Sequence, residues 1–197
     1  KSTGVIWASR SSKYQDIKTE TVLAKLNRHV NIAHKLTHPG IAKFGGFSPV
    51  SFTNQIEPVI VDEYSPNGTL KSIIKLESCG LSPDNWDSTQ KLIVLYGIAN
   101  AMAFLHKHGI VHRKLQPSSI LINDSLYPRI GNFAFAKFYS LERKISTKAR
   151  VIGGSPFYMA PEILNSLQYS EATDVYAFAI TAYEIITNLP PYQITDL

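Results

Sequence analysis

Residues 112–122 read His112-Arg113-Lys114-Leu115-Gln116-Pro117-Ser118-Ser119-Ile120-Leu121-Ile122. The stretch begins as a polar loop and ends in apolar residues that predict a short buried strand over residues 120–122. Lys114 stands inside the loop, and a lysine ammonium offers three hydrogen-bond donors and no acceptor. While it is charged, Lys114 therefore cannot take a proton from another group.

Apolar helices are predicted on both sides of this loop. Residues 89–108 are nearly all apolar and are followed by Gly109, a residue typical of helix C-termini. Residues 170–187 form the second helix, with Ser170 suited to cap it and acidic residues in its first turns. A strand is expected near residues 129–131, whereas residues 132–162 show no clean periodicity.

The N-terminal part of the chain predicts strands and one helix. Strands are expected over residues 4–10, 41–47 and 57–63, the last two joined as a hairpin. Apolar spacing over residues 14–35 indicates an amphipathic helix. Ser65-Pro66-Asn67-Gly68 is a strong turn signal, followed by a short helix over residues 69–76. The pattern predicts an α+β, two-lobe fold, with a small lobe over residues 1–64 and a helical lobe over residues 65–197.

Composition bounds the class of protein. The chain has 197 residues, of which 44% are hydrophobic and 18% charged, so we expect an ordered globule with a sizeable core. The net charge of +5 includes no long Lys/Arg block, which argues against a nucleic-acid partner. No apolar run is long enough to cross a membrane. The single cysteine, Cys79, allows no internal disulfide and fits a reducing, cytoplasmic location.

Several short motifs occur in a fixed order along the chain, and together they resemble those of a protein kinase domain. They are Leu36-Thr37-His38-Pro39, Val61-Asp62-Glu63-Tyr64, Gly109-Ile110-Val111-His112-Arg113, Gly154-Ser155-Pro156-Phe157-Tyr158-Met159-Ala160-Pro161-Glu162 and Thr173-Asp174-Val175-Tyr176. The likeness is to the tyrosine-kinase-like and serine/threonine branches and covers nearly the whole chain. It implies a kinase-like fold, truncated here, because the glycine-rich phosphate loop is missing and the chain ends after the helix that the family calls F.

The resemblance places substituted residues at the positions that carry chemistry. The family has an Asp at the place of Lys114, where it accepts the substrate hydroxyl proton, and a Lys at the place of Gln116. Ser119 replaces the Asn that holds magnesium, and Asn132-Phe133-Ala134 replaces the Asp-Phe-Gly whose Asp holds it. Serine is a weak magnesium ligand and Asn132 carries no charge, so we expect weak magnesium binding or none. Ala134 lacks the conformational freedom of the family's glycine, which favours a single conformation of this segment.

Two further positions alter the family's Lys–Glu ion pair. Arg10 stands at the lysine position of the first strand, and His29, 19 residues later, stands at the glutamate position. The alternatives are that Arg10 is an ordinary strand residue and that His29 lies on the surface of its helix. Asp62 falls at the back of the adenine pocket, where Arg10 or His29 would be its partner; the alternative is an alignment that is wrong by one residue.

Other positions match the family. Ala8, Glu63, Tyr64 and Leu121 are expected to line the nucleotide site. The residues that hold the scaffold are also kept: His112, Arg113, Phe133, Glu162 and Asp174. In the family, Glu162 pairs with an arginine that lies beyond this chain. Residues 137–154 contain cations among serines and a threonine, and are either a phosphorylated regulatory loop or a solvated one.

Three functions remain open at this level. The first is a pseudokinase that binds ATP weakly without magnesium, or not at all, and works by docking a protein partner. The second is an active serine/threonine kinase that transfers the γ-phosphate of ATP by an unorthodox route. The third is a non-functional gene fragment. The residues at catalytic positions are substituted, whereas the residues that hold the scaffold are kept. This contrast favours the pseudokinase.

Overall fold

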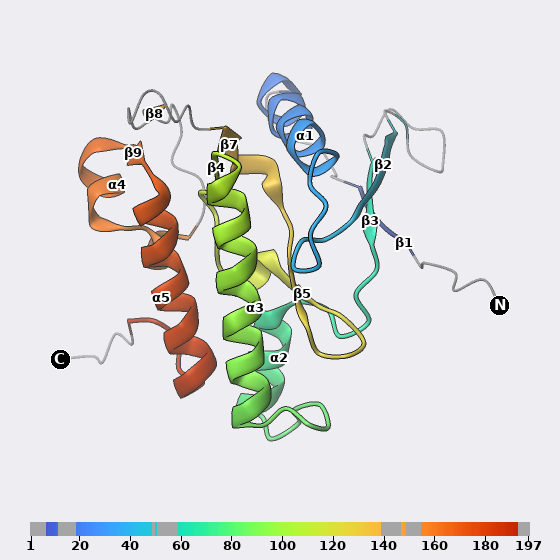
Figure 1. The fold of residues 1–197 in the computed structure, drawn as a ribbon, viewed down its shortest axis with the longest axis vertical. Helices are drawn as coiled ribbons and strands as arrows, with labels where there is room; N and C mark the ends of the chain where they lie inside the picture. Colours follow the sequence, from blue (N-terminus) through green and yellow to red (C-terminus); the bar gives the residue numbers. More distant parts are fainter. Residues whose placement is uncertain are drawn as a thin grey trace.

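The structure is a computed structural model and describes residues 7–11, 19–48, 50, 59–138, 147–148 and 155–192; for residues 7–11, 19–23 and 147–148 it describes the backbone alone. An antiparallel three-stranded sheet lies at one end (Figure 1). Its strands are β1 (Trp7–Ser11), β2 (Phe44–Ser48) and β3 (Val59–Glu63), in the order β1-β3-β2. The predicted strands are confirmed, although β2 begins three residues later than expected; residues 4–6 and 57–58 lie outside the described residues.

One helix, α1 (Thr19–Ala33), contacts the sheet at β2 and packs against the short helix η2 (Phe133–Phe135). Its buried residues, Leu26, His29, Ile32 and Ala33, follow helical spacing along one face. The helix ends two residues before the predicted end, and residues 14–18 of the prediction lie outside the described part.

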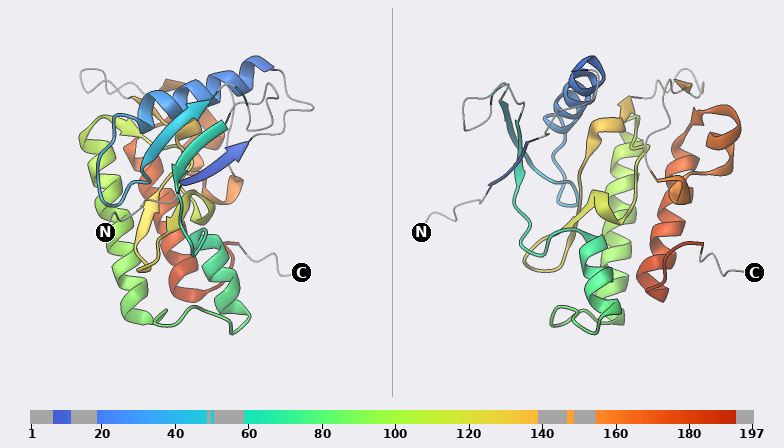
Figure 2. Two further views of the ribbon diagram at one scale, coloured as in Figure 1. Left: turned by 90° about the vertical axis from the view of Figure 1, so that its right-hand side faces the viewer. Right: turned by 180° about the vertical axis from the view of Figure 1, so that it is seen from behind.

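Three helices build the larger part of the molecule. α2 (Leu70–Ser78) follows the predicted turn, where the N–H of Gly68 donates to the carbonyl of Ser65 at 3.0 Å. α3 (Ser88–Lys107) and α5 (Glu171–Thr187) are in contact and run side by side (Figures 1 and 2). Both apolar helices are thus confirmed. Ser170 is confirmed as the N-cap residue of α5, and its backbone N–H donates to the hydroxyl of Thr173 at 3.3 Å.

Short elements connect the helices. They are β4 (Ile110–Val111), η1 (Pro117–Ser119), β5 (Ile120–Ile122), β6 (Pro128–Ile130), β7 (Lys137–Phe138), β8 (Thr147–Lys148), η3 (Pro156–Tyr158), α4 (Pro161–Ser166) and β9 (Gln168–Tyr169). β5 agrees with the prediction and β6 is shifted by one residue. α4 and the two-residue strands were not predicted, because they are too short to leave a periodic pattern.

Backbone hydrogen bonds join the sheet end to the helical part. Ala42 donates to the carbonyl of Ile130 at 2.9 Å, and Ile130 donates to that of Gly40 at 2.8 Å. A close approach holds β6 against α3, since a Cβ added at Gly97 would lie 2.6 Å from Pro128 Cγ. The loop of residues 112–119 and η2 therefore lie where α1 meets the helices.

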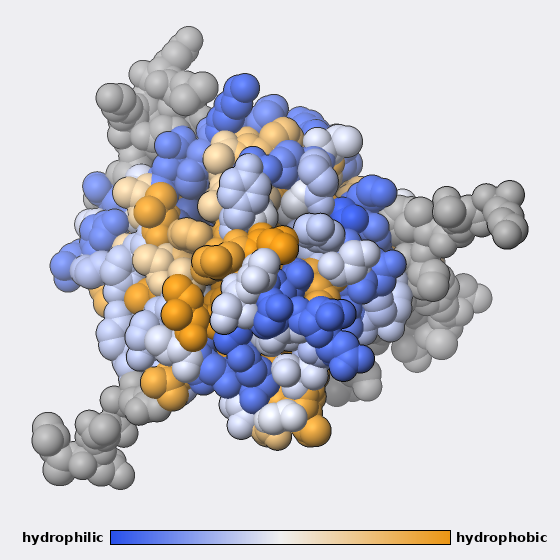
Figure 3. Space-filling view, turned by 60° about the horizontal axis from the view of Figure 1, so that its bottom comes forward, coloured by the Kyte–Doolittle hydropathy of each residue, from blue (hydrophilic) through white to orange (hydrophobic). Residues whose placement is uncertain are grey.

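The main core runs through the helical part of the molecule. Its fully buried members include Val94, Ile98, Leu105, Ile122 and Ile185. The end of the molecule furthest from α1 shows apolar patches interrupted by polar side chains (Figure 3). No described helix is long and apolar enough to span a membrane.

Candidate functional site

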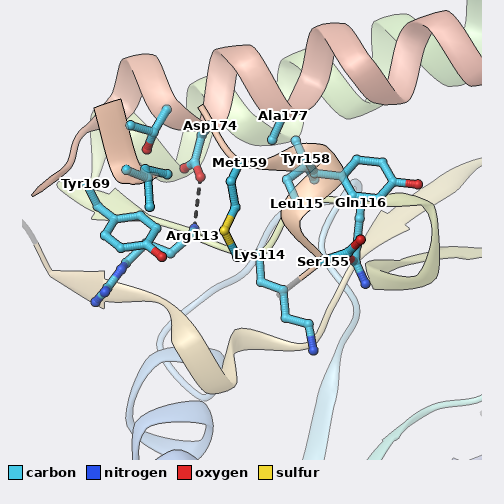
Figure 4. A pocket seen from close by; sticks show the side chains of 12 residues that line it. Arg113, Lys114, Leu115, Gln116, Ser155, Tyr158, Met159, Tyr169, Asp174 and Ala177 are labelled. Atoms are coloured by element: carbon cyan, nitrogen blue, oxygen red, sulfur yellow. Dashed lines mark hydrogen bonds between the residues drawn. The ribbon is translucent and has the colours of Figure 1, made fainter. Parts of the chain in front are cut away.

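Asp174 connects the loop of residues 112–119 to α5. Its carboxylate is 1% exposed and accepts hydrogen bonds from the backbone N–H of His112 and of Arg113, both at 2.8 Å. His106 Nε2 lies 3.0 Å from the same carboxylate. Figure 4 shows the bond from Arg113 beneath α5. A buried carboxylate with several N–H partners is a strong anchor, so Asp174 fixes where the loop begins.

His112 extends this anchor toward the next segment. Its ring is fully buried, and Nε2 lies 2.9 Å from the carbonyl of Gly131 while Nδ1 accepts from the N–H of Lys114 at 3.3 Å. Since Nδ1 accepts, the proton sits on Nε2 and the ring is neutral. Burial lowers the pKa of His112, in agreement with the neutral form. The edge of the ring meets Phe133, with ring centroids 5.5 Å apart.

Lys114 points away from this anchored core. Its side chain extends away from α5 (Figure 4), and its ammonium lies 4.9 Å from the centre of the Phe135 ring. Lys25 of α1 carries a second ammonium, 5.1 Å from the centre of the same ring. Burial, and after it the charge of Lys25, lowers the pKa of Lys114. The position predicted for a catalytic base is thus occupied by one of two neighbouring cations.

Ser119 is used inside the loop. Its side chain is 2% exposed and its hydroxyl donates to the carbonyl of Lys114 at 2.8 Å. Its own carbonyl accepts the N–H of Gly131 at 2.9 Å. The side chain of Gln116 is also engaged within the loop, because its amide donates a hydrogen bond to the hydroxyl of Ser118 at 2.5 Å. Both polar side chains therefore serve the loop's own backbone and neighbours.

Asn132 adopts the left-handed conformation, with φ 62° and ψ 55°. Asparagine tolerates this region better than most residues. Phe133 follows as the first residue of η2 and is 1% exposed, whereas Ala134 accepts a hydrogen bond from Arg28 at 3.0 Å. Ala134 is outside the positive-φ region, so the segment needs no glycine in this conformation.

Of the two alternatives for His29, the one that places it on the surface of its helix is wrong. His29 is 2% exposed, and its Nδ1 accepts the N–H of Phe133 at 3.1 Å. Its Nε2 therefore carries the proton and faces Asp62, 3.6 Å from Oδ1. Asp62 is itself 7% exposed, and His29 is one of the two partners predicted for it. The side chain of the other, Arg10, lies outside the described part. The side chain of His29 thus connects α1, β3 and η2.

The remaining residues of the predicted nucleotide site come from β1, β3 and β5. The backbone register of β1 sets Ala8 opposite Asp62 and Arg10 opposite Ile60, while the side chains of both lie outside the described part. Glu63 Oε2 lies 3.6 Å from Arg129 Nη1. Tyr64 is 46% exposed, and Leu121 is half-buried next to Gly131.

Two further predicted positions are Arg113, in the loop itself, and Glu162, in α4. Arg113 has φ 66° and places its guanidinium 4.0 Å from the centre of the Tyr169 ring, and burial lowers its pKa. Glu162 is exposed and makes no salt bridge to a described residue. Residues 139–146 and 149–154 of the predicted regulatory loop lie outside the described residues.

A small cavity of about 20 Å³ lies between the loop and α5. Its lining includes Lys114, Gln116, Ser155 and Tyr158. Such a volume holds about one water molecule, so this cavity is no nucleotide site.

Sequence reasoning missed Lys25 and Phe135. Lys25 precedes His29 by four residues and so lies on the same face of α1, which is the signal that could have found it. Phe135 offered no such signal, because it lies in a stretch without periodicity.

A family model described as protein kinase domain matches residues 1–196. The probable serine/threonine-protein kinase gdt4 of Dictyostelium discoideum is 31% identical over 193 residues, covering 95% of this chain and 11% of that protein. An Aurora kinase of Saccharomyces cerevisiae is 27% identical, covering 98% of this chain and 49% of its own length. A protein kinase and PP2C-like domain-containing protein of Arabidopsis thaliana is 27% identical, covering 92% and 28%. The chain spans half or less of each of these relatives.

Proposed function

The chain belongs to the protein kinase domain family, and we propose that within it this domain is a pseudokinase, which keeps the fold and has lost phosphoryl transfer. Its role is to dock a protein partner in a signalling assembly. The observation that carries the proposal is the pair formed by Lys114 and Ser119. Lys114 places an ammonium group at the position of the catalytic base. The hydroxyl of Ser119 donates a hydrogen bond to the backbone carbonyl of Lys114.

Loss of the base supports this function. A general base must accept a proton from the substrate hydroxyl, and proton transfer of this kind contributes about 10²- to 10⁴-fold to a rate. An ammonium has no lone pair to offer. Lys25, which lies near Lys114, adds a second positive charge. The two charges together would repel a cation carried by a protein substrate.

The residues at the metal positions do not fit magnesium. Magnesium in kinases is held by carboxylate and amide oxygens together with the substrate phosphates. Ser119 is buried and engaged within the loop, and Asn132 supplies no charge. Among the described residues, no group of three or more His, Cys, Asp or Glu side chains could hold a metal ion. We therefore assign weak, magnesium-independent ATP binding, or none.

The replacement at His29 supports the same conclusion from the side of α1. In an active kinase a glutamate from this helix orients the phosphate-binding lysine. Here the imidazole accepts the N–H of Phe133 and faces Asp62, so it fixes the helix to the segment that normally moves. A domain held in one arrangement suits a scaffold better than a switchable enzyme.

The location assigned to this domain is inside the cell. Cys79 is an exposed free thiol, and exposed thiols persist best in a reducing compartment.

The direct test is phosphotransfer from γ-labelled ATP by the purified full-length protein with magnesium. We expect incorporation no greater than that of the Lys114→Ala variant. Incorporation that Lys114→Ala or Asn132→Ala abolishes would overturn the proposal, because those residues would then act in the reaction.

An active serine/threonine kinase is the second candidate. The names of the relatives favour it, and so does the lowered pKa of Lys114, since a neutral amine can accept a proton. The same phosphotransfer experiment decides between them. For this candidate, the rate should rise with pH as Lys114 loses its proton.

A further inference from the structure

Two ammonium groups from separate parts of the chain share one aromatic ring. Lys25 belongs to α1 and Lys114 to the loop of residues 112–119, and their Nζ atoms lie 5.1 Å and 4.9 Å from the centre of the Phe135 ring. An aromatic ring attracts cations, so contact with Phe135 orders both flexible side chains. This is an arrangement of two positioned donors and not a scatter of solvated lysines.

No described carboxylate lies within salt-bridge distance of either ammonium group. Two carboxylates of α5 are engaged elsewhere, because Asp174 binds the loop backbone and Glu184 accepts the hydroxyl of Tyr158 at 2.5 Å. The charge of Lys25 disfavours the charged form of Lys114, so the two cations repel each other. A bound dianion would remove that repulsion.

Two arginines extend the same field. Arg28 lies one turn after Lys25 and is held by the carbonyl of Ala134, and Arg113 precedes Lys114 in the loop. The charge of Arg28 lowers the pKa of Arg113, after the larger effect of burial. Arg28 and Arg113 therefore add positive charge near Lys25 and Lys114.

We propose that Lys25 and Lys114 form a binding site for a phosphate monoester carried on a serine or threonine side chain of a protein partner. The inference rests on the proposed function, because Lys114 stands where an active kinase would meet the hydroxyl of its substrate. An ammonium at that point repels a proton transfer but attracts the phosphorylated form of the same side chain. Three phosphate oxygens match two ammonium groups as acceptors better than one carboxylate does.

Binding of the full-length protein to two degenerate peptide pools tests the site. One pool has phosphoserine at a fixed central position, and the other has serine there. We expect retention of the phosphoserine pool alone. Lys25→Gln and Lys114→Gln should each weaken binding about tenfold, the effect of one charge-assisted hydrogen bond. Lys114→Arg keeps the charge and should bind within about threefold of the unchanged protein. Lys75→Gln, which changes an exposed lysine of α2, is the matched control and should have no effect.

The alternative source of phosphate is ATP itself. Excess ATP without magnesium should leave peptide binding unchanged. Displacement by ATP that is lost in Lys25→Gln and Lys114→Gln would assign the site to nucleotide phosphates and overturn the inference. Equal retention of both pools, or unchanged binding by both glutamine variants with normal melting curves, would also overturn it. None of these outcomes depends on phosphotransfer, so failure of this site and failure of the pseudokinase assignment are distinguishable.

Discussion

The two sides of the loop of residues 112–119 differ in how their polar groups are used. Behind the loop, the carboxylate of Asp174 and the ring of His112 are buried and engaged by backbone groups from distant parts of the chain. In front of it, Lys114 directs a cation outward beside a second cation. We infer that the backbone geometry of this loop does not need the charges that perform phosphoryl transfer in active kinases. The scaffold depends on Asp174, whereas nothing in the scaffold depends on a carboxylate at residue 114.

We call the side of the loop that contains Asp174 and His112 the rear side, and the side that contains Lys114 the front side. Asp174→Ala should cause the largest loss of stability on the rear side. It leaves the buried N–H groups of His112 and Arg113 without an acceptor, and we expect a loss of about 3–5 kcal/mol in the free energy of unfolding. Urea denaturation measures it. Asp84→Ala, at an exposed turn, is the control and should change stability by less than about 0.5 kcal/mol. A loss below about 1 kcal/mol in Asp174→Ala would remove the contrast between the two sides.

His29→Glu restores the residue of active kinases and should still destabilise this domain. The new carboxylate would lie close to Asp62, where the imidazole Nε2 is now 3.6 Å away, so we expect a loss of about 2 kcal/mol. His29→Gln is the matched control, because its amide can accept from Phe133 and donate to Asp62. A more stable His29→Glu would mean that a cation such as Arg10 pairs with the new carboxylate, and the family's ion pair would then be recoverable.

Acidification should lower the free energy of unfolding through His112, on the rear side of the loop. Burial holds the pKa of His112 below 6.5 in the folded protein, so the unfolded chain binds more protons as the pH falls below that value. Stability from this group is therefore present above pH 6.5 and is lost on acidification, with a slope of at most about 1.4 kcal/mol per pH unit. Unfolding measured at pH 7.5 and 5.5 checks it, and His112→Gln should flatten the slope. A slope that His112→Gln leaves unchanged would assign the effect to another group, such as His38, whose pKa burial also lowers.

Asn132→Asp tests the front side and should have the smallest effect on stability. Aspartate tolerates the left-handed conformation nearly as well as asparagine, so we expect a change within about 0.5 kcal/mol. The measurement is the melting temperature without ligand. A large loss would mean that the Asn132 amide contributes to the scaffold, and the division between the two sides would fail there.

Much of this fold could be predicted from local patterns. The helix α5 was predictable because its apolar run and its capping residue Ser170 lie within one short window. The strand β5 was predictable because its three apolar residues are consecutive. The burial of His29 could not be predicted in this way. Helical periodicity treats a histidine as polar, whereas its burial depends on the N–H of Phe133, 104 residues away in the sequence. Lys25 and Phe135 meet for the same reason, through packing of α1 on η2 that no single window contains.

We propose that the side of the loop that carries Lys114 has lost magnesium binding while the kinase fold is kept. The most direct measurement is the melting temperature of the full-length protein titrated with ATP, with and without magnesium. We predict the same small shift, or no shift, in both conditions, because Ser119 and Asn132 do not build a magnesium site. A shift that requires magnesium would contradict the loss of magnesium binding.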